Sequence, residues 1–144
     1  FPGFPTDLQA PFTALMTIAN GESKITETIF ENRMNHIYLL NEMGARIKLN
    51  KNVAHIKGVK TIKGMNLVGS DLRSSAALII AGIIAKGSSK IYGLEHLDRG
   101  YENFELKLKN LGIKIIREIN KSTYEENEYQ IEFKSEENSK FEAA

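Results

Sequence analysis

An aspartate and an arginine stand two positions apart at the start of an almost wholly apolar stretch, GSDLRSSAALIIAG. Asp71 suits the first turn of a helix, where free amide hydrogens and a partial positive charge favour an acid. Arg73 carries the wrong charge for that end of a helix. Two interpretations are open. Arg73 pairs with Asp71 or another carboxylate at the surface, or Arg73 and the helix end together hold a phosphate or carboxylate group of a substrate.

Three other charged residues occupy comparable places elsewhere in the chain. Asp7 opens an earlier helix in PTDLQ, much as Asp71 does in SDLR. Arg99 in HLDRGYEN lies between a predicted strand and a predicted helix, and Arg33 in FENRMN, 66 positions earlier (99 minus 33), holds the matching place in the first half of the chain. An acid in a first turn is commonly only a dipole partner, and a solvated turn would account for Arg99. Charged residues in loops beside glycine are nevertheless frequent at functional sites.

Hydrophobic period and turn residues predict the elements that must position these residues. Helices are expected over 6–20, 33–44, 71–86 and 101–111. Strands are expected over 23–30, 46–50, 53–59, within 61–70, and over 88–95 and 113–119, with a further candidate at 129–133. Thr6 and Gln9 have the spacing of a capping box at the first helix.

The order of these elements repeats. GESKI at 21–25 and GSSKI at 87–91 follow the first helix of each half. The helix at 71–86 is apolar nearly all round, which indicates burial on every side. We therefore expect an α+β (mixed α/β) fold of duplicated units with buried central helices, spanning about 1–60 and 61–120. Pseudosymmetry would bring the matching charged residues toward one end. The polar segment 121–144 is expected to be a mobile tail apart from its candidate strand.

Composition excludes several classes of function. The chain of 144 residues has a net charge of +1, so nothing in its overall charge favours nucleic acid or an acidic membrane. It has no cysteine, which rules out a disulfide or a cysteine nucleophile within it. His36, His55 and His96 lack metal-ligand spacing, so no metal site is expected. No apolar run approaches the roughly 20 residues that cross a membrane.

Four stretches make the sequence recognisable: FPGFPTDLQAPF, ITETIFENRMNHIYLLNEMGA, GSDLRSSAALIIAG and YGLEHLDRGYENFELKLKNLGI. Together they resemble the C-terminal portion of the UDP-N-acetylglucosamine 1-carboxyvinyltransferase family of enolpyruvyl transferases. The resemblance covers residues 1 to about 120. The 3-phosphoshikimate 1-carboxyvinyltransferases share that fold, but the motifs TDLQ, FENR and DRGYE are similar to those of the sugar-nucleotide enzymes.

The resemblance implies a fold and an activity. The fold is an inside-out α/β barrel of two domains, each with three βαβαββ-type units around buried helices, and the active site lies between the domains. The activity transfers the enolpyruvyl group of phosphoenolpyruvate to the 3-hydroxyl of UDP-N-acetylglucosamine and releases phosphate, without a cofactor. Such an enzyme serves peptidoglycan precursor synthesis in the bacterial cytoplasm, and with it cell shape and cell division.

The resemblance also implies roles for single residues. Asp7 matches the acid that contacts the sugar hydroxyl and is the favoured general base. Arg73 and Arg99 match arginines that face the phosphate and carboxylate of phosphoenolpyruvate. These three are the expected catalytic residues.

The same three residues also count among the expected substrate-binding residues, and four more join them. Ile29 and Phe30 match the strand end that lines the nucleotide-sugar pocket. Arg33 matches a site arginine, and Asp71 matches the acid beside the reaction intermediate.

The departures from the family are large. Its proton-donating cysteine loop, its N-terminal lysine and its opposing domain have no counterpart here, so the N-terminal domain of the same enzyme is an expected partner. The segment alone is expected to be inactive. The start at FPGFP, without an initiator methionine, indicates a chain cut from a longer protein. A noncatalytic binding or scaffold domain that reuses the repeat is the alternative from another class.

Overall fold

The computed structural model describes residues 3–119 and 129–134 of the chain. The first unit contains η1 (Thr6–Leu8), α1 (Gln9–Met16), β1 (Glu22–Thr26), α2 (His36–Glu42), β2 (Arg46–Asn50) and β3 (Val53–Lys57). The second unit contains β4 (Asn66–Val68), α3 (Leu72–Ile84), β5 (Ser88–Tyr92), α4 (Glu95–Asp98), α5 (Phe104–Asn110), β6 (Ile115–Ile119) and β7 (Tyr129–Lys134).

The two units build sheets with the same strand pattern. The first sheet has the order β1-β3-β2 with antiparallel pairs throughout. In the second sheet, β5, β7 and β6 repeat that arrangement, and β4 is added in parallel beside β5. In each unit the last strand therefore lies between the other two. The expected α+β fold class with repeated units is confirmed.

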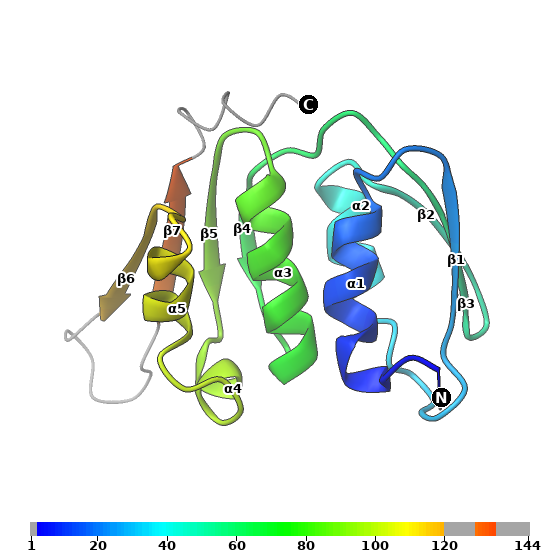
Figure 1. Ribbon diagram of the computed structural model, residues 1–144, viewed down its shortest axis with the longest axis horizontal. Coiled ribbons are helices and arrows are strands. Elements are labelled where there is room, and N and C mark those ends of the chain that lie inside the picture. The colour runs from blue at the N-terminus through cyan, green and yellow to red at the C-terminus, as the bar shows by residue number, and fades with distance from the viewer. Residues whose placement is uncertain (1–2, 120–128, 135–144) are drawn as a thin grey trace.

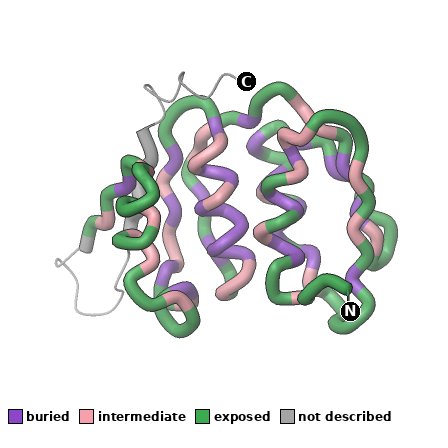
Figure 2. The backbone as a smooth tube through the Cα atoms, in the orientation of Figure 1, coloured by how far each residue is buried: buried purple, intermediate pink, exposed green. Residues whose placement is uncertain are grey.

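The core lies between the two sheets, where α1 packs against α3 (Figure 1). Buried positions follow α3 for most of its length, as the purple segments of Figure 2 show. Small residues face inward on both helices, among them Ala10 and Ala14 on α1 and Ala77 and Ala81 on α3. Small side chains let two helices approach closely. The burial expected for an apolar helix at 71–86 is confirmed for most of α3, which spans Leu72–Ile84, although Ile80, Ile83 and Ile84 are only partly buried.

Several element boundaries differ from those expected. The strand expected over 23–30 ends at Thr26, and the helix expected over 33–44 begins only at His36. The intervening connection turns because the side chain of Glu27 accepts hydrogen bonds from the backbone amides of Ile29 and Phe30. These bonds compete with strand pairing.

Two further differences concern the second unit and the tail. The strand expected over 88–95 stops at Tyr92, and a short helix, α4, follows after Gly93, whose φ of 74° favours glycine. The strand expected at 129–133 is present as β7, so the tail contributes to the sheet there. The other tail residues, 121–128 and 135–144, lie outside the described residues, as do 1–2.

Candidate functional site

The segments that carry the expected site residues lie at one end of the molecule. The N-terminal ends of α1 and α3, the 27–35 connection and α4 all lie along the lower edge of Figure 1. Because each unit repeats the same order of elements, equivalent connections fall at the same end. The expectation that pseudosymmetry brings these segments toward one end is confirmed.

Asp71 caps α3. Its Oδ1 accepts hydrogen bonds from the backbone amides of Arg73 and Ser74, at 2.9 and 3.0 Å. This use of the carboxylate satisfies two of the four amide hydrogens that a helix start leaves free. Asp71 thus occupies the helix start where the sequence placed it, and its side chain meets the backbone of Arg73 rather than the guanidinium.

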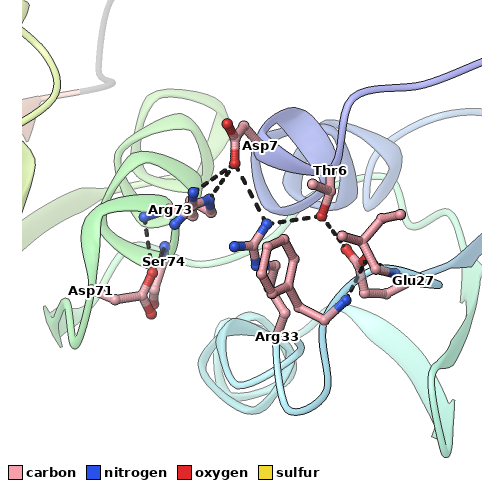
Figure 3. A network of polar contacts seen from close by, with 9 residues as sticks. Thr6, Asp7, Glu27, Arg33, Asp71, Arg73 and Ser74 are labelled. Atoms are coloured by element: carbon pink, nitrogen blue, oxygen red, sulfur yellow. Dashed lines mark hydrogen bonds and ion pairs between the residues drawn. The ribbon is translucent and has the colours of Figure 1, made fainter. Parts of the chain in front are cut away.

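The guanidinium of Arg73 pairs instead with Asp7, which belongs to the other unit. Nη2 and Nε of Arg73 lie 2.6 and 2.8 Å from Asp7 Oδ1, and Arg33 Nη1 lies 3.5 Å from the same oxygen (Figure 3). The side chain of Asp7 is 68% exposed, against 29% for Arg73 and 15% for Arg33. Two arginines therefore hold one oxygen of an accessible carboxylate. Asp7 Oδ2 has no hydrogen-bond partner among the residues that the structure describes.

The predicted capping box at Thr6 and Gln9 is wrong. Neither η1 nor α1 has a side-chain cap. The hydroxyl of Thr6 donates to Glu27 Oε2 at 2.6 Å and accepts from Arg33 Nη1 at 2.9 Å. Gln9 is buried and donates to Thr13 Oγ1. A turn of 3-10 helix precedes α1, so these two side chains meet tertiary partners instead of each other.

Glu27 is a buried acid that sequence reasoning missed. Only 4% of it is exposed, and its Oε1 accepts from the amides of Ile29 and Phe30, at 2.8 and 3.3 Å. Burial alone would raise the pKa of Glu27, but the hydrogen bonds from Thr6, Ile29 and Phe30 and the charge of Arg33 outweigh it and lower the pKa. The available signal was an acid inside an otherwise strand-like stretch.

Ile29 and Phe30 present their side chains to solvent, each 48% exposed. The guanidinium carbon of Arg33 lies 3.6 Å from the centre of the Phe30 ring, within cation–π range. Both residues line a cavity of about 590 Å³, together with Arg33, Leu49 and Asn52. Exposed apolar side chains beside a cationic group are typical of a binding wall.

A smaller cavity adjoins this wall at the start of α3. It measures about 280 Å³ and is lined by Phe30, Glu31, Asn32, Arg33, Asn35, His36, Asp71, Arg73 and Ser74. Two cationic side chains and a helix N-terminus together favour an anionic ligand. Sequence reasoning also missed His36 here, which is 2% exposed and whose pKa is lowered by burial to about 4, despite the opposing charge of Asp71.

Arg99 lies at the same end but outside this cluster. It follows the last residue of α4, is exposed, and neither lines the cavities of about 590 and 280 Å³ nor forms a hydrogen bond or ion pair with the other expected site residues among those described. An ion pair between Arg117 of β6 and Asp98, at 2.5 Å, anchors α4. The structure brings Arg33 and Arg73 to the same oxygen, Oδ1 of Asp7. Asp71 and Phe30 line the adjoining cavity of about 280 Å³ with these arginines.

No metal site emerges among the described residues. Within residues 3–119 and 129–134, no group of three or more potential ligand side chains is close enough to hold a metal ion. No helix in the same ranges has the length and apolar character to cross a membrane. A larger cavity of about 770 Å³ lies on strands β1, β2 and β3, but it contains none of the expected site residues.

One family model matches most of the chain. Residues 1–108 match the model of the family EPSP synthase (3-phosphoshikimate 1-carboxyvinyltransferase). The match covers most of the chain, so the chain belongs to this family.

Curated relatives of the chain carry a different and more specific enzyme name than the family model. The chain is 89% identical over 144 residues to the UDP-N-acetylglucosamine 1-carboxyvinyltransferase of Prochlorococcus marinus strain AS9601, covering 100% of this chain and 32% of the relative. It is 53% identical over 116 residues to the enzyme of that name from Trichormus variabilis, covering 81% and 26%. The expected resemblance is confirmed. The chain spans about a third of the length of the curated relatives it matches.

Solved structures agree on the fold. The enolpyruvyl transferase NikO from Streptomyces tendae matches with a TM-score of 0.67 and 28% identity, over 75% of this chain and 25% of that one. EPSP synthase from Acinetobacter baumannii matches with a TM-score of 0.66 and 16% identity, over 89% and 28%. The second likeness, at so low an identity, concerns the fold alone.

Proposed function

We propose that this chain forms one wall of the active site of a UDP-N-acetylglucosamine 1-carboxyvinyltransferase. The complete protein, meaning this segment with the remaining length that its relatives have, transfers the enolpyruvyl group of phosphoenolpyruvate to the 3-hydroxyl of the sugar nucleotide. The observation that carries the proposal is the exposed carboxylate of Asp7, held at one oxygen by Arg33 and Arg73. The names of the curated relatives support this acceptor.

Asp7 is the general base of the proposed reaction. Its Oδ2 accepts the proton of the sugar 3-hydroxyl, while the arginines fix Oδ1 and so orient the carboxylate. The sugar oxygen attacks C2 of phosphoenolpyruvate as C3 gains a proton from outside this chain. The tetrahedral intermediate then loses a proton from C3 and expels phosphate. The enolpyruvyl ether of the sugar nucleotide remains.

Arg73 and Arg99 are proposed to bind the anionic groups of phosphoenolpyruvate. Arg73 sits at the start of α3, where the helix dipole adds to its charge. Positive charge at that point stabilises the negative charge that develops on the phosphate. Asp71 holds the first turn of α3 in place beside the intermediate.

Ile29, Phe30 and Arg33 are proposed to line the acceptor pocket. The cavity of about 590 Å³ has the mixture of apolar and polar lining that a sugar nucleotide requires. The N-terminal domain of the complete protein supplies the opposite wall and the proton donor. The enzyme then acts in peptidoglycan precursor synthesis in the bacterial cytoplasm, and so in cell shape and division.

A competition between acceptors tests this proposal. The complete protein is incubated with phosphoenolpyruvate and either UDP-N-acetylglucosamine or shikimate 3-phosphate, and released phosphate is measured. We expect phosphate only with the sugar nucleotide. Release only with shikimate 3-phosphate would support the alternative that the family name describes. Release with neither acceptor would favour a noncatalytic domain.

A further inference from the structure

Glu27 bonds to the segment that carries Ile29 and Phe30 and, through the hydroxyl of Thr6, is linked to Arg33. We propose that Glu27 is a positioning residue, which fixes the Ile29–Phe30 wall through one carboxylate oxygen and fixes Arg33 through the other. The inference rests on the proposed function, because it assigns Glu27 to the acceptor side of that site. Figure 3 shows the carboxylate of Glu27 between Thr6 and the connection that carries Arg33.

Oε1 of Glu27 fixes the backbone path of the segment that carries Ile29 and Phe30. Glu27 Oε1 accepts from the amides of both Ile29 and Phe30. The backbone of Glu27 is itself held by Asn52, with Glu27 N donating to Asn52 O at 2.9 Å and Asn52 Nδ2 donating to Glu27 O at 2.6 Å. The side chains of Ile29 and Phe30 are half exposed and have little core packing to hold them. Their position therefore depends on Glu27.

The second oxygen determines the direction of a hydrogen-bond relay. A guanidinium can only donate, so the Thr6 hydroxyl must accept from Arg33 Nη1. The single hydroxyl hydrogen then goes to Glu27 Oε2, which must be an acceptor. Arg33 in turn reaches Asp7 Oδ1 and covers the ring of Phe30. Glu27 thus orients Arg33 without touching it.

Charge balance favours an ionised acid at this position. The linked cluster contains two cations, Arg33 and Arg73, and two acids, Asp7 and Glu27. Glu27 is the buried member, and a buried charge is tolerated only with several hydrogen bonds. It has three from the chain, two of them from backbone amides.

Paired variants of the complete protein distinguish the roles of the two carboxylate oxygens of Glu27. In Glu27→Gln the amide oxygen can still accept from Ile29 and Phe30, but its NH2 group faces Thr6 and ends the relay. Thr6→Val ends the relay from the other side. We expect each variant to lower kcat/KM for UDP-N-acetylglucosamine about tenfold, with KM for phosphoenolpyruvate within twofold of the unaltered protein. The double variant should be no worse than either single one, since both break one relay.

Two controls distinguish positioning from general damage. Thr6→Ser keeps the hydroxyl and should stay within twofold, as should Glu22→Gln, which changes an exposed acid on β1. The inference is overturned if Glu27→Gln and Thr6→Val both match the unaltered protein, or if their losses multiply. It is also overturned if KM rises equally for both substrates.

Amide hydrogen exchange gives a test that needs no activity. In the complete protein the amides of Ile29 and Phe30 should exchange slowly, and Glu27→Ala should speed their exchange at least tenfold. Equal exchange in both proteins would overturn the positioning role. An unaltered protein that transfers nothing to the sugar nucleotide would instead defeat the proposed function, while the exchange comparison still decides whether Glu27 holds the wall.

Discussion

Asp7 shows how an exposed residue can be held without being buried. Two arginines from separate segments converge on its Oδ1, and about two thirds of its side chain remains accessible. Exposed ion pairs of this kind contribute about 0–1 kcal/mol to folding. The arrangement therefore does little for stability, and its value lies in orienting a carboxylate toward solvent, where a substrate hydroxyl would approach.

The first prediction at this scale concerns the carboxylate of Asp7. Asp7→Asn keeps the shape of the side chain but removes its basicity, so kcat of the complete protein should fall at least 100-fold. The unfolding midpoint in urea should change little, because the lost pair is exposed. Steady-state kinetics and urea titration measure the two quantities. A variant that keeps more than a tenth of kcat would exclude Asp7 as the base.

The second prediction concerns His36, whose pKa of about 4 lies below the usual value of 6.5 because the ring is buried. Between these values the unfolded chain binds a proton and the folded chain does not, so stability is complete above pH 6.5 and falls as pH drops toward 4. The loss at pH 5 should be about 2 kcal/mol. Urea unfolding of the complete protein at pH 7.5 and 5 measures it.

A matched pair of variants isolates this contribution. His36→Leu removes the buried ring nitrogens and should flatten the fall in stability between the two pH values. His55→Asn changes an exposed histidine on β3 and should leave the fall unchanged. An identical fall in His36→Leu and the unaltered protein would show that another group is responsible.

At the scale of elements, α3 fixes the position of Arg73, which we propose to bind an anionic group of the substrate. The helix is buried along most of its length, so its start cannot shift without disturbing the core. Asp71 satisfies the amides of Arg73 and Ser74 at that start. A rigid helix with a fixed first turn positions Arg73 more accurately than a loop would.

The third prediction belongs to this element. Asp71→Ala removes the cap of α3 and should lower the free energy of unfolding by about 1 kcal/mol. Asp71→Ser keeps a capping oxygen and should recover most of that loss, although it removes the charge. Urea unfolding of the complete protein gives both values. Equal losses in the two variants would indicate that charge, and not the cap, is what stabilises the helix start.

At the scale of the whole molecule, the described residues form only one side of the proposed site. The cavities of about 590 and 280 Å³ are lined mainly by the 27–35 connection and the start of α3, which lie at one end of the molecule in Figure 1. The chain spans about a third of its curated relatives, so much of their length lies outside it. A surface of this kind needs an opposing wall to exclude water from a reacting pair.

The fourth prediction follows from this incompleteness. The 144-residue segment alone should release no phosphate from phosphoenolpyruvate and UDP-N-acetylglucosamine. Adding the remainder of the complete protein as a separate chain should restore release, because the two walls can then associate. A coupled phosphate assay measures both. Phosphate release by the isolated segment would contradict the prediction.

Most of the helices and strands, their order and their repetition could be predicted from the sequence, although the short helix α4 could not. The spacing of apolar residues predicted the buried helix that the structure has as α3. The recurrence of GESKI and GSSKI predicted a repeat, and the two sheets have matching strand patterns. These features are local, because the pattern of side chains along a few turns decides which face is buried. Asp71 could be placed at a helix start for the same reason.

The long-range partners of the polar side chains at the site follow from tertiary packing and could not be predicted from the sequence. Arg73 pairs with Asp7 and not with Asp71, and Thr6 bonds to Glu27 and not to the start of its own helix. Arg99 lies at the expected end but outside the cluster. The physical reason is that these partners lie far apart along the chain. They meet only because α1 packs against α3 and the 27–35 connection turns beneath them, which no local pattern specifies.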